Sequence, residues 1–79
     1  MSTKEITYCI VKSLGVISKS NKHTKELSIV SWNGRKPVYD LRVWKTETDG
    51  SKTPCKGISL SEEDLLTLKE LLSCINVEV

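Results

Sequence analysis

Trp32 and Trp44 lie on either side of Arg42 in the segment W-N-G-R-K-P-V-Y-D-L-R-V-W, and together these side chains could bind a flat, anionic ligand. From Val38 onward the residues alternate between apolar and polar, and a strand places alternate side chains on opposite faces. This pattern puts Arg42 and Trp44 on one face together with Asp40. The opposite face, which we expect to pack on a core, carries Tyr39, Leu41 and Val43.

Single-stranded nucleic acid is the first ligand that this combination suggests. A protein that binds it without reading its sequence needs aromatic side chains for stacking and cations along the phosphate backbone. Stacking contributes about 1–3 kcal/mol per base, and phosphate contacts make the affinity depend on salt. We predict that Trp32 and Trp44 stack on bases, and that Arg42 pairs with phosphate or lies flat on a base. The loop cations predicted to follow the backbone are Lys22, Lys25, Arg35 and Lys36.

The alternative is that both tryptophans are ordinary core residues, as tryptophans on a sheet often are. The outward positions would then be those of Tyr39 and Leu41, which would make a poorer binding surface. The alternation therefore favours an outward Trp44, whereas the orientation of Trp32 is less determined because it adjoins the Asn33-Gly34 turn.

The charge distribution suggests a polyanionic partner for the first part of the chain. Residues 1–57 contain eleven Lys/Arg and five Asp/Glu, whereas residues 58–79 contain one Lys and five Asp/Glu. The basic body and the acidic end together give the formal net charge of +2. Clustered cations attract nucleic acid, although a surface with 28% charged residues can also be uneven by chance.

The three cysteines, Cys9, Cys55 and Cys74, form no C-x-x-C pair and have no histidine cluster beside them. This argues against a disulfide framework and a structural zinc site, and it favours a reducing, cytoplasmic setting. No apolar run approaches the roughly 18 residues of a membrane span, and the N-terminus lacks the apolar core of a signal peptide. We expect no metal, no cofactor and no membrane association.

Enzymatic function finds little support in the sequence. It contains no P-loop, no dinucleotide-binding glycine fingerprint and no nucleophile with a base at a recognisable spacing. His23 is expected to be a solvated loop residue, because no second ligand or nucleophile accompanies it. Asp40 is expected to form a salt bridge with Arg42 or a lysine rather than to act as a general base.

The elements expected to position these residues are four strands and one helix in a single domain, residues 1–79. The strands are predicted at Ile6–Ile17, Glu26–Trp32, Val38–Lys45 and Cys55–Leu60. Gly15 interrupts the first of them, which indicates a bulge or bend in a long curved strand. Polar loops are expected at Ser18–Lys25 and Thr46–Pro54. The predicted fold class is α+β, with a curved antiparallel sheet followed by a C-terminal helix.

The helix is expected to begin after Ser61, a good N-cap that precedes carboxylates near the positive end of the helix dipole. Apolar residues then recur at helical spacing, and Leu66 and Leu71 widen this stripe beyond what one sheet face would cover. We infer a second copy of the helix as the partner, because so short a chain buries only a small core. The alternative is that Leu66 and Leu71 line the edge of a single core. The predicted homodimer interface comprises Leu65, Leu66, Leu68, Leu71, Leu72 and Ile75.

The segment from Trp32 to Trp44, followed after a loop by P-C-K-G-I-S-L-S-E-E-D, resembles the positive-cofactor-four family of transcriptional coactivators, and in particular its small bacterial, YdbC-like members. The similarity extends from about Lys25 to Leu72 and is weaker in the first strand. The resemblance implies a single-stranded DNA-binding homodimer with a curved sheet, in which the C-terminal helix builds the dimer. Ribbons of both subunits would form grooves for the DNA strand.

Position by position, the resemblance gives Trp32 the aromatic position at the end of the second strand and Arg42 the basic position of the third. Trp44 matches the stacking aromatic that closes the third strand. Lys56 and Gly57 match the basic-glycine pair that opens the fourth.

The chain departs from the family pattern at Cys55 and Val30, which stand where some members carry basic residues. It also lacks the long regulatory extension of the eukaryotic members. The resemblance therefore implies the binding module rather than transcriptional coactivation proper.

These observations predict a non-enzymatic, sequence-tolerant single-stranded DNA-binding homodimer that acts in transcription, replication or repair. RNA is an alternative ligand, because nothing in the sequence selects for or against a 2′-hydroxyl group. A second alternative is a protein-interaction module that docks on RNA polymerase or replication proteins through its apolar-basic sheet and leucine-rich helix. A third is a protein whose basic excess is accidental and whose tryptophans are buried.

Overall fold

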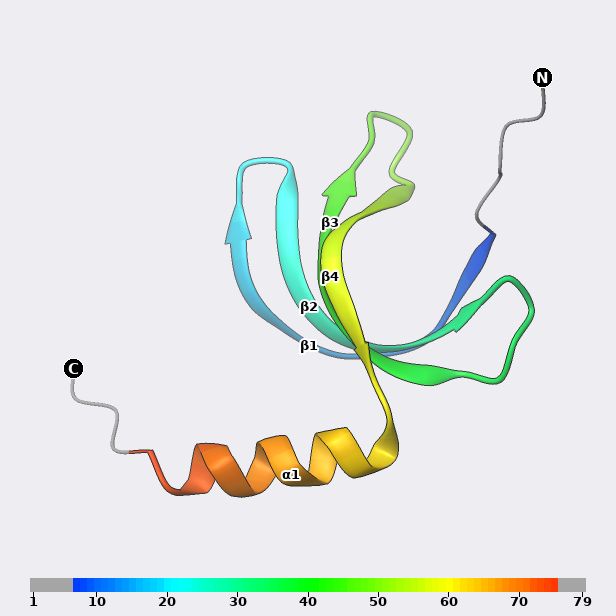
Figure 1. The fold of residues 1–79 in the computed structure, drawn as a ribbon. Helices are drawn as coiled ribbons and strands as arrows, with labels where there is room; N and C mark the ends of the chain where they lie inside the picture. Colours follow the sequence, from blue (N-terminus) through cyan, green and yellow to red (C-terminus); the bar gives the residue numbers. More distant parts are fainter. Residues whose placement is uncertain (1–6, 76–79) are drawn as a thin grey trace.

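The computed structural model describes residues 7–75, which form an antiparallel sheet of four strands followed by one helix (Figure 1). Strands β1 (Tyr8–Ser20), β2 (His23–Trp32), β3 (Val38–Thr46) and β4 (Lys52–Leu60) lie side by side in sequence order, and helix α1 (Glu62–Ser73) follows. The predicted α+β fold, with an antiparallel sheet and a C-terminal helix, is thus confirmed. Ile6, the predicted start of the first strand, lies outside the described residues.

The strands are longer than the sequence predicts, and the first and third of the loops between them are correspondingly shorter. Polarity predicts a loop at Ser18–Lys25, but Ser20 pairs with His23 and most of this segment is strand. Asn21 in the turn has a φ of 53°, a left-handed conformation that asparagine tolerates and tight hairpins require. β4 likewise begins at Lys52 instead of Cys55, because pairing with β3 extends into the predicted loop.

β1 shifts its register with β2 at three places, where the sequence predicts a single interruption at Gly15. The shifts lie between Ile10 and Lys12, Ser13 and Gly15, and Val16 and Ser18. They leave Val11, Leu14 and Ile17 as the extra residues. Bulges bend a strand and increase its twist, so a series of them accounts for the strong curvature of this edge strand (Figure 1).

The sheet curls tightly around one of its faces. Trp44 pairs with Thr24, eight residues along β2 from Trp32. On a flat sheet this separation would be about 26 Å at ~3.3 Å per residue, yet the two indole rings lie 6.3 Å apart. The Tyr8 hydroxyl also donates a hydrogen bond to the Lys52 carbonyl oxygen, which joins the start of β1 to the start of β4. We call the enclosed side of the sheet the concave face and the opposite side the convex face.

The completely buried side chains lie on the concave face. They are Val30 and Trp44 together with the polar residues Glu26, Ser28 and Asp40. The convex face, with Tyr39, Leu41 and Val43, is only half-buried. The expectation that this apolar face packs on a core is therefore wrong within one chain. The reason is that the curl closes the concave face on itself, whereas α1 contacts only β3 and β4 among the strands.

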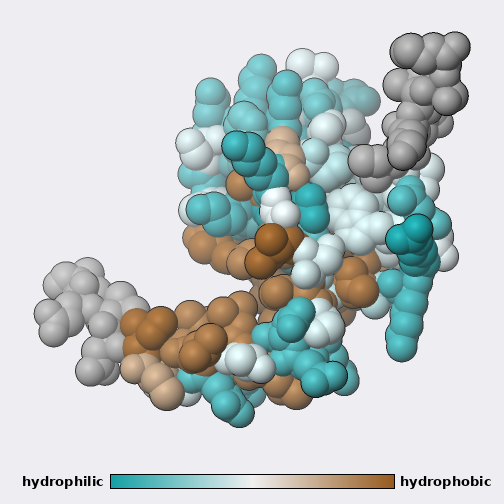
Figure 2. Space-filling model, viewed as in Figure 1, coloured by the Kyte–Doolittle hydropathy of each residue, from teal (hydrophilic) through white to brown (hydrophobic). Residues whose placement is uncertain are grey.

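Helix α1 lies on the convex side of the sheet (Figure 1). Its large apolar side chains Leu66, Leu71 and Leu72 are exposed. As predicted, Ser61 caps its N-terminus: the Ser61 hydroxyl accepts a hydrogen bond from the Asp64 amide, and the Asp64 carboxylate accepts one from the Ser61 amide. No residue of α1 is buried. Figure 2 shows apolar surface on the helix and on the facing side of the sheet, with a hollow between them.

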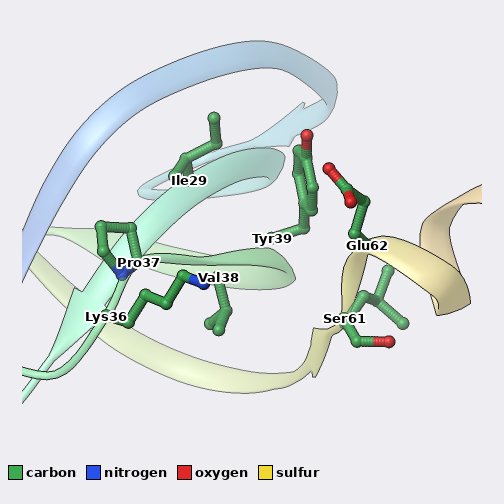
Figure 3. A pocket seen from close by; sticks show the side chains of 8 residues that line it. Ile29, Lys36, Pro37, Val38, Tyr39, Ser61 and Glu62 are labelled. Atoms are coloured by element: carbon green, nitrogen blue, oxygen red, sulfur yellow. The ribbon is translucent and has the colours of Figure 1, made fainter.

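A shallow cavity of about 390 Å³ marks the place where the convex face, the β2–β3 turn and the start of α1 meet (Figure 3). Ile29, Tyr39 and Leu60 contribute to its apolar lining, whereas Lys36 and Glu62 bring charges of opposite sign to it. The cavity forms one end of the apolar surface that a single chain leaves open.

Candidate nucleic-acid interface

Three aromatic side chains gather on the concave face: Tyr8 of β1, Trp32 of β2 and Trp44 of β3. The Tyr8 ring lies 6.0 Å from Trp32 and 5.5 Å from Trp44, and the two indoles are nearly parallel, with an interplanar angle of 2°. Trp44 is completely buried and Trp32 is partly exposed. The prediction that Trp44 points into solvent is therefore wrong. Alternation places it correctly opposite the apolar face, but the curl of the sheet encloses it.

Arg42 lies over the Trp32 ring and is held there by three hydrogen bonds. Its Nε and Nη2 donate to the two oxygens of the Asp40 carboxylate at 2.7 and 2.8 Å, and its Nη1 donates to the Cys55 carbonyl oxygen at 3.0 Å. The guanidinium carbon lies 4.6 Å from the centroid of the Trp32 ring, which is within the range of a cation–π contact. The predicted salt bridge between Asp40 and Arg42 is confirmed.

Gly57 of β4 pairs with Arg42 and leaves room for its side chain. A Cβ added at Gly57 would lie 1.9 Å from the Arg42 Cβ and 2.6 Å from the Leu41 carbonyl oxygen, which is closer than atoms can approach. The position therefore accepts only glycine unless the backbone shifts. This gives a physical reason for the glycine in the Lys56–Gly57 pair.

A second buried ion pair on the concave face joins Glu26 to Lys52, with an N–O distance of 2.7 Å. Burial opposes the ionisation of Glu26, but hydrogen bonds from Lys52, Thr24 and Ser13 and the charge of Lys52 outweigh it, so the pKa of Glu26 lies below its ordinary value. Sequence reasoning missed both members of this pair. The alternation of β2 could have placed Glu26 beside Val30, but nothing in the sequence indicated that Lys52 reaches it.

The other predicted cations are exposed and have no ion-pair partner within residues 7–75: Lys22, Lys25, Arg35, Lys36 and Lys56. Arg35 and Lys36 occupy the β2–β3 turn next to Trp32, and the Arg35 amide donates to the Trp32 carbonyl oxygen at 2.9 Å. Lys22 lies in the turn at the other end of β2, and Lys25, opposite Val43, lies on the convex face. The structure thus distributes these cations over several places and does not gather them in one patch.

Within residues 7–75, no three His, Cys, Asp or Glu side chains come together in a way that could hold a metal ion. Among the same residues no helix could span a membrane, since α1 has 12 residues and a bilayer crossing needs ~20.

Comparison with known proteins adds two findings. The sequence model of the family described as Transcriptional Coactivator p15 (PC4) matches residues 19–71. An uncharacterized protein of Treponema pallidum (strain Nichols) is 35% identical over 72 residues, which cover 90% of this chain and 81% of that protein. The family match confirms the resemblance that the D-L-R and K-G-I-S-L segments indicate, and it includes all eight predicted nucleic-acid-binding positions.

Proposed function

Because the chain belongs to the transcriptional coactivator p15 (PC4) family, we propose that it binds single-stranded DNA without strong sequence preference, as a non-enzymatic homodimer acting in transcription, replication or repair. The observation that carries the proposal is the 4.6 Å contact between Arg42 and Trp32. Exposed cations of the β2–β3 turn, Arg35 and Lys36, adjoin this contact. A nucleic acid strand with exposed bases and phosphates requires such a combination of an aromatic ring and neighbouring cations.

In this proposal Trp32 stacks on bases, because it is the more exposed of the two tryptophans. Trp44 is completely buried and supports the Trp32 ring from within the concave face. Its contribution to binding is therefore indirect, unlike the stacking that the sequence predicts for it.

The exposed cations hold the phosphate backbone in this proposal. Arg35 and Lys36 lie in the β2–β3 turn that follows Trp32, and Lys56 lies on β4 beside Gly57. Lys22 lies in the β1–β2 turn. Lys25 lies on the convex face and contributes only at longer range. Each cation that neutralises a phosphate of a single strand makes the slope of log affinity against log salt concentration more negative by about 0.7.

We also propose that two copies associate through α1 and the convex face. Leu66, Leu71, Leu72 and Ile75 are 54–59% exposed in one chain. A second copy would cover the hollow between α1 and the sheet, and it would align the ribbons of both sheets along one strand of DNA.

The proposal is tested by fluorescence anisotropy with a labelled oligothymidine, a duplex of the same length and the corresponding RNA, each at two salt concentrations. We expect tight binding to the DNA single strand that weakens as salt increases. Trp32→Ala should weaken binding at both salt concentrations, and Lys69→Gln on α1 is the control. The absence of binding to all three ligands would contradict the proposal, and equal or tighter binding of RNA would favour RNA as the ligand.

The uncovered apolar surface supports one other candidate function, which is docking on RNA polymerase or a replication protein. Sedimentation velocity at micromolar concentration separates the two uses of this surface. A dimer covers the apolar face with a second copy, whereas a monomer leaves it open for a different protein.

A further inference from the structure

The geometry points to Asp40 as the residue that determines how Arg42 acts. We propose that the Asp40 carboxylate neutralises Arg42, so that the guanidinium orients Trp32 for stacking and does not neutralise a phosphate. The inference rests on the proposed binding of single-stranded DNA. In this inference Arg42 orients Trp32, whereas the other cations hold the phosphate backbone of the DNA. Asp40 is then a positioning residue that acts through Arg42.

Most of the hydrogen-bonding capacity of Arg42 is already used within the protein. Three of its nitrogens donate to Asp40 and to the Cys55 carbonyl oxygen at 2.7 to 3.0 Å, and its side chain is only 15% exposed. The two N–Hs that bind the carboxylate form the paired geometry in which arginine binds carboxylates and phosphates alike. A phosphate would therefore have to compete with Asp40 for the Nε–Nη2 edge of the guanidinium, and only one N–H each of Nη1 and Nη2 is left for it.

Asp40 is held in the pair by its surroundings. Its side chain is completely buried, and its Oδ1 also accepts a hydrogen bond from Ser59 at 3.2 Å. A buried carboxylate that loses its cation is strongly destabilising. The pair should therefore persist when nucleic acid binds, and the net charge that it presents to a phosphate is zero.

Arg42 differs from the other cations that we propose to hold the phosphate backbone. Arg35, Lys36 and Lys56 are exposed and have no carboxylate partner within the part of the chain that the structure describes. Arg42 instead lies over an aromatic ring, in a space that Gly57 leaves open. The planar guanidinium of Arg42 is therefore placed to hold the Trp32 ring. The exposed charges of Arg35, Lys36 and Lys56 remain available to phosphates.

The experiment measures the slope of log affinity for oligothymidine against log salt concentration in full-length variants. Asp40→Asn keeps the size of the side chain and removes its charge, so it should release the charge of Arg42 and steepen the slope by about 0.7. Lys56→Gln should make the slope shallower by about 0.7, and Lys69→Gln should leave it unchanged. An unchanged or shallower slope for Asp40→Asn would overturn the inference.

Arg42→Lys provides a second test that leaves Asp40 paired with a cation. Lysine keeps the charge but lacks the planar fork, so we expect the affinity to fall about tenfold at every salt concentration with an unchanged slope. The free variant should also show stronger acrylamide quenching of Trp32, while the buried Trp44 contributes little. Affinity and quenching equal to those of the wild type would show that Arg42 does not orient Trp32.

The two proposals fail in different ways. If the wild-type protein binds no oligothymidine, the proposed function is wrong and the inference falls with it. If the wild type binds and the slopes of the variants contradict the expectation, only the inference is wrong.

Discussion

The concave and convex faces of the sheet distribute polar and apolar residues in opposite ways. The concave face contains two completely buried carboxylates, Glu26 and Asp40, each paired with a cation. The convex face and α1 expose large apolar residues, such as Ile58 at 57% and Leu71 at 59%. Buried charges persist when they are paired and hydrogen-bonded, and exposed apolar patches usually mark an interface. Within this chain, the curvature of the sheet therefore determines which side chains are buried. The exposed apolar residues mark the surface that a second copy would cover in the proposed dimer.

The largest expected effect tests whether the concave face is the core of the single chain. Trp44→Ala should lower the free energy of unfolding by about 3–5 kcal/mol, because it removes a completely buried aromatic side chain and leaves a cavity. Urea unfolding followed by circular dichroism measures the change. Trp32→Ala, at the more exposed neighbour, should cost clearly less. Equal, small losses in both variants would mean that the aromatic cluster does not form the core.

The next effect tests the convex side. Leu72→Glu should weaken dimerisation by about 10- to 100-fold, because an apolar side chain that contributes roughly 1.5–3 kcal/mol on burial is replaced by a charge. Leu72 is 58% exposed in one chain, so the folded monomer should be little affected. Sedimentation equilibrium over a range of concentrations measures the dissociation constant.

Thr67→Glu is the matched control for Leu72→Glu, because it adds the same charge at an exposed polar position of the same helix. Its dimerisation should remain close to that of the wild type. If both variants dissociate equally, the effect is one of charge, and the apolar surface of α1 is not the interface.

A smaller effect is expected where β4 meets Arg42. Gly57→Ala should destabilise the protein by about 1–3 kcal/mol, as overpacking of a filled site does, since its Cβ would lie 1.9 Å from the Arg42 Cβ. Gly15→Ala is the control, because nothing lies within 4 Å of a Cβ added there. Thermal unfolding compares the two variants, and equal melting temperatures would contradict the close approach of β4 to Arg42.

The order of the elements could be predicted because each carries a local signal. Alternation marks the strand that ends in Trp44, and the spacing from Ser61 to Asp64 marks the start of the helix. Even the pair of Asp40 and Arg42 could be predicted, since residues two apart on a strand share a face.

The curl of the sheet could not be predicted, because it depends on contacts between residues that lie far apart in the sequence and on strands that are not neighbours. The extra residues of β1 are Val11, Leu14 and Ile17. Gly15 marks the bulge at Leu14, but no glycine or proline marks those at Val11 and Ile17. The hydrogen bond between Tyr8 and Lys52 joins the two edge strands of the sheet. The alternation rule therefore places Trp44 on the correct face but cannot indicate that this face is enclosed.

The smallest effect concerns the second ion pair of the concave face and depends on pH. The pKa of Glu26 lies below its ordinary value of 4.5, so this carboxylate stabilises the folded protein above pH 4.5, and the stabilisation is lost as the pH falls through the lower pKa of the folded state. Glu26→Gln should therefore be less stable than the wild type at neutral pH, and this difference should shrink as the medium becomes acidic. Urea unfolding of both proteins between neutral and acidic pH measures it. A difference that stays constant or grows on acidification would mean that the ionised Glu26 carboxylate and its pair with Lys52 do not stabilise the fold.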